Sequence, residues 1–170
     1  MGVFDTIKQR NKSIKFSAER MALSAAGTLA IDTICSPPDL SKAKRVLFVQ
    51  PHPDDNQIGA GGTIAWLISL GVEVWELTVT DDRYADPAYM GKENEIETTR
   101  QKEAMAAQRY LGMRNAGFLG FADKTRKSAD EISQAILPVI RKIKPDYVLT
   151  VDPNLATETH SDHIKVGNAV

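Results

Sequence analysis

The alternation of apolar runs with helical patterns after residue 44 is the feature that most constrains the fold of this chain. Short apolar runs indicate buried strands at 45–49, 72–80, 116–119 and 147–151. Longer segments with helical periodicity lie between them, at 60–70, 94–111 and 130–143. Strands that alternate with helices form βαβ units, in which successive strands are parallel and helices cover the sheet. The sequence therefore predicts an α/β fold with a Rossmann-like, mostly parallel sheet and helices on both faces.

The first forty or so residues differ from the rest of the chain. They are helix-prone and moderately amphipathic, and they end near Pro37-Pro38, which cannot continue a helix. We predict an N-terminal helical extension over 1–42 and a single α/β domain over 43–170. We expect that domain to be incomplete at its C-terminus, because the sequence stops at Val170, a few residues into the helix that should follow residue 162.

Composition narrows the classes of partner. The 21 basic and 22 acidic residues give a net charge of -1, so there is no electrostatic reason to expect nucleic acid. The longest apolar stretch, 21–34, is shorter than the about 20 residues that a membrane span needs. The single cysteine excludes an internal disulfide framework, which fits a reducing compartment. We therefore expect a cytoplasmic protein with a small-molecule partner, and a homo-oligomer stays open.

All three histidines of the chain follow predicted strands. His52 comes after the first strand, and His160 and His163 come after the fourth, each beside acidic residues. Because ligands bind at the carboxyl ends of strands in open α/β sheets, we expect these two segments to meet in one site. A His-Pro-Asp-Asp string can also be a simple turn, and histidines at a helix start can be caps. The coincidence of all three histidines with strand ends favours a metal site.

His52, Asp55 and His163 are the predicted metal ligands. Two neutral imidazoles and one carboxylate form a ligand set of catalytic zinc, which leaves one coordination position for a water molecule. Such a water becomes a nucleophile near neutral pH, so the set indicates hydrolytic chemistry. Iron or cobalt also accepts these ligands, so another divalent metal stays open.

The remaining polar residues of the two segments receive supporting roles. Asp54 is the predicted general base, because adjacent side chains on an extended loop point in different directions. His160 is expected to protonate the leaving amine or to stabilise the oxyanion. Asp162 is expected to orient an imidazole from behind, and Asp81 and Asp82 after the second strand are further candidates for substrate contact.

Four ordered motifs carry a resemblance to a known family. They are Pro51-His52-Pro53-Asp54-Asp55 with the glycine-rich 59–65, Arg100 with Glu103, Leu119 to Asp123, and His160-Ser161-Asp162-His163. In order and spacing they resemble the LmbE/PIG-L family of zinc-dependent deacetylases. The similarity covers roughly residues 44–170, which makes it far more specific than a lone glycine-rich loop.

This resemblance implies an LmbE-like fold and an amide hydrolase that acts on a carbon–nitrogen bond other than a peptide bond. It implies zinc at His52, Asp55 and His163, with Asp54 as the base. The reaction would remove an N-acetyl group from a glucosamine-containing small molecule or glycoconjugate by attack of zinc-bound water. Arg100 and Asp123 would contact sugar hydroxyls. Without the resemblance, Arg100 and Glu103 would simply be an exposed helical pair.

Asn56 marks a departure from the family pattern, which usually has an acidic residue directly after the paired aspartates. Asn56 keeps hydrogen-bonding capacity but lacks the charge, and we count it among the residues that contact substrate. The substitution motivates an alternative function, a catalytically impaired module for sugar binding or assembly. A nucleotide-binding Rossmann domain is disfavoured, because the full glycine fingerprint is missing.

Overall fold

The computed structural model describes residues 38–170, and nearly all of the predicted N-terminal extension lies outside the described residues. Residues from Leu40 to Val170 form one compact unit. None of the helices in the described part of the chain combines the length and the apolar character that crossing a membrane requires.

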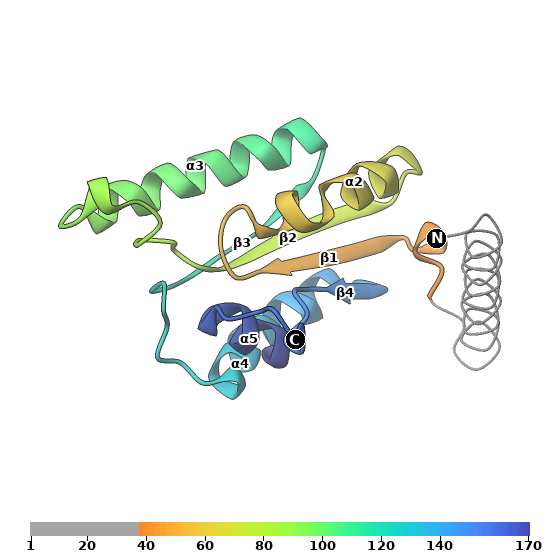
Figure 1. Ribbon diagram of the computed structural model, residues 1–170. Coiled ribbons are helices and arrows are strands. Elements are labelled where there is room, and N and C mark those ends of the chain that lie inside the picture. Colours follow the sequence, from red (N-terminus) through yellow and green to blue (C-terminus); the bar gives the residue numbers. More distant parts are fainter. Residues whose placement is uncertain (1–37) are drawn as a thin grey trace, which may run out of the picture. The chain divides into compact units, whose positions relative to one another are not determined.

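A four-stranded parallel sheet forms the centre of the domain (Figure 1). Its strands are β1 (Arg45–Gln50), β2 (Glu73–Thr80), β3 (Arg114–Phe121) and β4 (Tyr147–Leu149). Their order across the sheet is β3-β2-β1-β4, and every neighbouring pair is parallel. The predicted fold class is confirmed. The predicted fourth strand is too long, because β4 pairs with β1 only as far as Leu149.

Helices cover the two faces of this sheet (Figure 1). One face carries α2 (Asp55–Ser69) and α3 (Glu93–Leu111), and the other carries α4 (Ala129–Ile143) and α5 (Ser161–Ala169). Short 3-10 helices, η1 (Leu40–Lys42) and η2 (Pro87–Tyr89), lie in the connections. The sequence places the start of α2 at residue 60, whereas the helix begins at Asp55, because the polar residues after Pro53 form its first turn.

The alternation of side chains along β1 builds a core on each face of the sheet. Val46 and Phe48 pack on the α2 side, where Ile64 and Leu67 are also fully buried. On the other side, Leu47 and Val49 contact residues of α4 and α5. Since all four strands are parallel, the loops that follow them leave from one edge of the sheet, and that edge carries the candidate site.

Candidate active site

The loop between β1 and α2 holds the first predicted ligands close together. Asp55 opens α2, and its Oδ2 accepts the backbone N–H of His52 at 2.8 Å. The same oxygen lies 3.3 Å from His52 Nδ1. The backbone N–H and the hydroxyl of Thr80 donate to the carbonyl of Pro51 at 2.9 and 2.8 Å, which ties this loop to the end of β2. The loop is therefore fixed on both sides of His52.

The first turn of α5 brings the second motif to the same place. His163 Nε2 lies 3.3 Å from Asp55 Oδ1 and 3.3 Å from His52 Nδ1. Its other ring nitrogen, Nδ1, is 2.8 Å from Glu158 Oε2, a contact that the sequence did not indicate. The segment after β1 and the first turn of α5 therefore meet, as the sequence predicts.

The spacing of these three side chains fits a metal ion. Bonds of about 2.0–2.1 Å in tetrahedral geometry separate ligand atoms by about 3.3–3.4 Å. His52 Nδ1 and His163 Nε2 are 3.3 Å apart, and each lies 3.3 Å from an oxygen of Asp55, Oδ2 for His52 and Oδ1 for His163. Both imidazoles also face a carboxylate through the other ring nitrogen, and such contacts orient metal-ligating histidines.

Two sets of three side chains among residues 38–170 have metal-binding potential by the distances between their ligand atoms, and neither is the predicted set of His52, Asp55 and His163. One is His52, His160 and His163, and the other is His52, Asp82 and Asp123, each with ligand atoms within 4.8 Å of one another. Asp82 is absent from the ligand set predicted from sequence. His52 belongs to every set because its two nitrogens face opposite ways, Nδ1 toward Asp55 and Nε2 toward Asp123 at 3.2 Å.

The electrostatics of the site suit a cation. Burial lowers the pKa of His52, but hydrogen bonds with Asp123, Asp162 and Asp55 outweigh that effect and raise the pKa to about 11. Burial raises the pKa of Asp123, yet the contact with His52 prevails and lowers the pKa to about 2. Carboxylates thus face both nitrogens of the imidazole, with Asp55 on the Nδ1 side and Asp123 and Asp162 on the Nε2 side.

Arg100 organises the residues beside the metal ligands. Its Nε donates to Asp82 at 2.6 Å, and its terminal nitrogens donate to Asp54 at 2.7 Å and Glu103 at 2.6 Å. Burial lowers the pKa of Arg100, but these hydrogen bonds outweigh it and raise the pKa further above its usual range. The guanidinium has five N–H donors, so two stay available for a ligand. Arg100 therefore does more than form an exposed helical pair with Glu103.

Asp123 and Asp162 both face the Nε2 side of His52. Asp162 is fully buried, and its Oδ2 lies 3.7 Å from His52 Nε2. Both carboxylates accept the backbone N–H of Lys124 at 2.7 Å. Asp162 thus lies close to the His52 ring, and its role in orienting an imidazole stays a prediction. Asp81, in contrast, pairs with Arg83 and accepts the backbone N–H of Asp123, so it holds the loop together.

The side chain of Asn56 does not lie where the sequence analysis predicted it. Its side chain is buried, and Nδ2 donates to Glu76 Oε2 at 3.1 Å beneath α2. Because α2 begins at Asp55, the next residue turns toward the sheet and away from the ligand atoms. The prediction that Asn56 contacts substrate is therefore corrected. Sequence reasoning also missed Glu76, although a charged residue within a buried strand was a visible signal.

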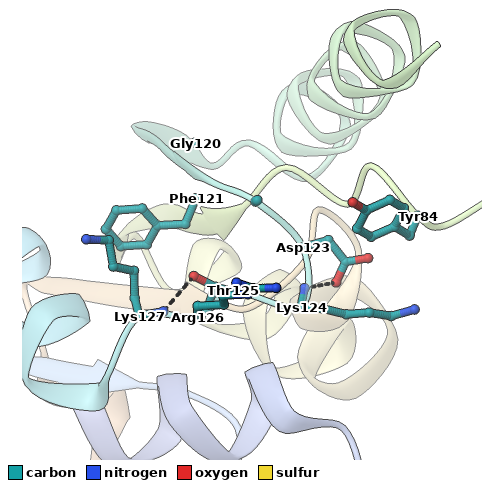
Figure 2. Close-up of a pocket in the computed structure, with 9 residues that line it drawn as sticks. Tyr84, Gly120, Phe121, Asp123, Lys124, Thr125, Arg126 and Lys127 are labelled. Carbon is teal, nitrogen blue, oxygen red and sulfur yellow. Dashed lines mark hydrogen bonds between the residues drawn. The ribbon is translucent and has the colours of Figure 1, made fainter. Parts of the chain in front are cut away.

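A pocket of about 580 Å³ lies beside these residues, after the end of β3 (Figure 2). It is lined by Tyr84, Gly120, Phe121, Ala122, Asp123, Lys124, Thr125, Arg126 and Lys127. Asp123 joins the pocket to the metal site, because the same carboxylate contacts His52. The pocket volume lies within the range of about 300–1,000 Å³ that is usual for small-molecule sites.

Comparison with known proteins identifies the family to which the chain is similar. The PIG-L family model, described as GlcNAc-PI de-N-acetylase, matches residues 47–170. Diacetylchitobiose deacetylase of Thermococcus kodakarensis is 36% identical, over 73% of this chain and 46% of that protein. The 1D-myo-inositol 2-acetamido-2-deoxy-alpha-D-glucopyranoside deacetylase of Mycolicibacterium smegmatis is 32% identical, over 73% of this chain and 51% of that protein. The chain thus spans about half the length of the curated relatives it matches.

Solved structures of similar proteins have the same fold as this chain. N,N'-diacetylchitobiose deacetylase from Pyrococcus horikoshii superposes with a TM-score of 0.73 and 32% identity, covering 86% of this chain and 55% of that one. GalB, a 4-carboxy-2-hydroxymuconate hydratase from Pseudomonas putida, reaches a TM-score of 0.63 at 23% identity, covering 74% of this chain and 54% of that one. The second likeness concerns the fold alone, so the chemistry has to be argued from the site.

Proposed function

This chain belongs to the PIG-L family of de-N-acetylases, and from that membership we propose that it is a zinc-dependent hydrolase that removes an N-acetyl group from a glucosamine-containing molecule. The observation that carries the proposal is the meeting of three side chains, in which His52 Nδ1 and His163 Nε2 lie 3.3 Å apart and each lies 3.3 Å from one oxygen of Asp55. Two imidazoles and one carboxylate leave one position open on a tetrahedral ion. The single cysteine supports a cytoplasmic location as part of this proposal.

The proposed reaction needs both the metal and Asp54 to activate a water molecule. When bound, zinc supplies a Lewis acid that polarises the amide carbonyl and lowers the pKa of a water molecule. Asp54 is half-exposed, and Arg100 holds its Oδ2 at 2.7 Å. The other oxygen stays free to take a proton from the attacking water. Arg100 is thus a positioning residue for the proposed base.

His160 is suited to stabilise the oxyanion that forms at the amide carbonyl. Its Nδ1 accepts the backbone N–H of Asp162 at 3.3 Å, so the matching neutral tautomer carries its proton on Nε2. Its ring centroid lies 4.7 Å from that of His52. In the proposed reaction a carbon–oxygen bond forms at the amide carbonyl and the carbon–nitrogen bond breaks. Asp54 takes the water proton and passes it to the leaving nitrogen, while the Nε2–H of His160 donates a hydrogen bond to the oxyanion, and the products are acetate and a free amine.

Arg100 and Asp123, at the edge of the site, are the residues proposed to bind the sugar. Arg100 retains two N–H donors for hydroxyl groups, and Asp123 lies where the metal site and the adjacent pocket meet. These contacts are proposals that the resemblance to the family supports. Asn56 has no part in them, because its side chain is directed into the core.

The proposal is tested by acetate release from N-acetylglucosamine and diacetylchitobiose, using the full chain and added zinc. We expect release that a chelator abolishes and that Asp54→Asn lowers by at least about a hundredfold, the lower range of a general-base effect. Metal content should be unchanged in that variant. Acetate release that persists in Asp54→Asn at the original rate would contradict the assigned base.

A second candidate is a sugar-binding or assembly module of the same fold. The observation that favours it is Asn56, an uncharged residue at the position where the family usually has an acidic one. The same experiment separates the two functions. Saccharide binding by calorimetry without zinc-dependent acetate release would support the module and exclude the enzyme for this chain.

A further inference from the structure

Glu158 lies in the irregular loop between β4 and α5, two residues before the second histidine motif. Its backbone N–H donates to the carbonyl of Leu155 at 2.9 Å, which closes a turn within this loop. Its side chain is only 17% exposed, although both neighbouring residues are exposed. A carboxylate is withdrawn from water at a cost unless hydrogen bonds replace those to the solvent, so the partners of Glu158 matter.

Both oxygens of the Glu158 carboxylate contact the second histidine motif. Oε1 accepts the backbone N–H of His160 at 2.7 Å, and Oε2 lies 2.8 Å from Nδ1 of His163. One side chain therefore holds both histidines of the motif. It holds the proposed metal ligand through its ring and the proposed oxyanion donor through its backbone.

The contact with Glu158 determines which ring nitrogen of His163 carries the proton. An ionised carboxylate offers only acceptor sites, so Nδ1 of His163 has to donate its N–H to Oε2. The neutral imidazole then has its lone pair on Nε2. Nε2 is the atom that lies 3.3 Å from Asp55 Oδ1 and 3.3 Å from His52 Nδ1. The tautomer that Glu158 selects is therefore the one that can bind a metal between these side chains.

His163 depends on Glu158 more than His52 depends on any single carboxylate. Asp123 and Asp162 both face Nε2 of His52, at 3.2 and 3.7 Å. Within residues 38–170, only Glu158 lies at hydrogen-bond distance from Nδ1 of His163. The loss of Glu158 would therefore leave this nitrogen without a second carboxylate to take its place.

Resting on the proposed deacetylase function, we propose that Glu158 is a positioning residue, which fixes the tautomer and ring orientation of His163 and holds His160 in register with it. A carboxylate that accepts the free N–H of a metal-bound imidazole also makes that imidazole more basic. Removing such a partner typically weakens metal binding about 10–100-fold.

Glutamine at position 158 removes one acceptor oxygen while keeping the length of the side chain. Its amide has one acceptor oxygen and one NH2 donor. If the oxygen stays on the backbone N–H of His160, the NH2 group faces Nδ1 of His163 and favours the tautomer with a proton on Nε2. That proton removes the lone pair that a metal ion needs. If the amide turns round, the backbone N–H of His160 loses its acceptor and the start of α5 is held less firmly.

The test is the zinc affinity of the full chain, measured by competition with a chelating dye of known affinity. We expect Glu158→Gln to bind zinc about 10–100-fold more weakly than the unmodified chain. Two control variants should bind zinc as the unmodified chain does. Glu95→Gln removes an exposed carboxylate from the first turn of α3, and Thr159→Ala changes the exposed neighbour of Glu158.

A second measurement reports the tautomer of His163 directly and does not depend on activity. Long-range proton–nitrogen NMR correlations of the zinc-free, isotope-labelled chain at pH 8 distinguish the two ring nitrogens of each neutral histidine. The chain has three histidines, so the signals of His163 can be assigned with His163→Ala. We expect the proton on Nδ1 in the unmodified chain and in Thr159→Ala, and a shift toward Nε2 in Glu158→Gln.

Equal zinc affinity in Glu158→Gln and the unmodified chain would overturn the inference. The same holds for a His163 proton on Nε2 in the unmodified chain, or for a loss in Thr159→Ala as large as that in Glu158→Gln. A chain that binds no zinc would overturn the inference together with the proposed metal site. Acetate release is measured in parallel, and zinc binding that depends on Glu158 without any release would refute only the deacetylase.

Discussion

Glu76 offers the sharpest test of how the fold supports the site. This carboxylate is completely buried in β2 and accepts hydrogen bonds from the side-chain amides of Asn56, Gln57 and Gln108 at 2.9–3.2 Å. No basic side chain in the described part of the chain pairs with it. Asn56 and Gln57 lie in the first turn of α2, directly after Asp55, so Glu76 anchors the turn that carries a proposed ligand.

Replacing Glu76 by leucine should be strongly destabilising. Asn56 and Gln108 are 6% and 3% exposed, so their amides would lose their acceptor and could not reach water. An unsatisfied buried donor costs about 1–3 kcal/mol, which gives about 2–6 kcal/mol for these two groups. Gln57 is less buried and adds little, because its amide can turn toward solvent.

Replacing Glu76 by glutamine should have the opposite effect near neutral pH. Burial raises the pKa of Glu76, and the three amide hydrogen bonds lower it only in part. A raised folded-state pKa means that stability is fully present below the ordinary value of 4.5 and is lost as pH rises through the folded-state pKa. Glutamine has no charge to bury. Its NH2 group takes the place of one acceptor oxygen, so the amide of Asn56 or Gln108 has to rotate and present its own oxygen, as does Gln57, whose Oε1 is buried and lacks a partner within residues 38–170.

The assay is urea unfolding of the three proteins between pH 5 and pH 8. The advantage of Glu76→Gln over the unmodified chain should grow with pH, while Glu76→Leu should be less stable than both at pH 7. Comparing variants at each pH cancels the titration of the other carboxylates. A glutamine variant as unstable as the leucine variant, or an advantage that does not change with pH, would refute this account of Glu76.

Two other predictions concern the elements around the site. Gly167→Ala would place a Cβ 2.8 Å from the carbonyl of Val151 and from Pro153 Cδ, so we expect α5 to shift at a cost of about 1–3 kcal/mol, with weaker metal binding through His163. Its matched control is Gly59→Ala in α2, where nothing lies within 4 Å and alanine should stabilise the helix by about 1 kcal/mol; equal melting temperatures for the two variants would contradict the packing argument. Arg100→Lys keeps the charge but cannot bridge Asp82, Asp54 and Glu103, so acetate release should fall at least about tenfold with metal content unchanged. Glu103→Gln, which removes only the exposed partner, should leave the rate nearly intact, and a larger loss there than in Arg100→Lys would contradict the positioning role.

The sheet was predictable because its strands are apolar runs bounded by turn residues. The juxtaposition of His52, Asp55 and His163 was predictable for a related reason, since parallel strands end at one edge. Helix boundaries were harder to predict. The sequence after Pro53 is polar and resembles a loop, yet Asp55 and the residues that follow form the first turn of α2.

The orientation of Asn56 could not be deduced from local sequence. It depends on Glu76 from the neighbouring strand and on Gln108 from α3, which share one buried network across 32 residues of sequence. Glu158 was missed for a similar reason, because its contact with His163 depends on the path of an irregular loop. Contacts that need three elements at once are fixed by packing, and no periodic pattern reveals them.

Zinc content per chain after exhaustive dialysis tests most directly whether His52, Asp55 and His163 hold one metal ion. We predict close to one zinc per unmodified chain, a large loss in His163→Ala and Asp55→Asn, and retention in His160→Ala and Asp82→Asn. The last two variants report on the alternative sets that share His52. Zinc that survives in His163→Ala but disappears in Asp82→Asn would contradict the assignment, as would an unmodified chain that retains no metal.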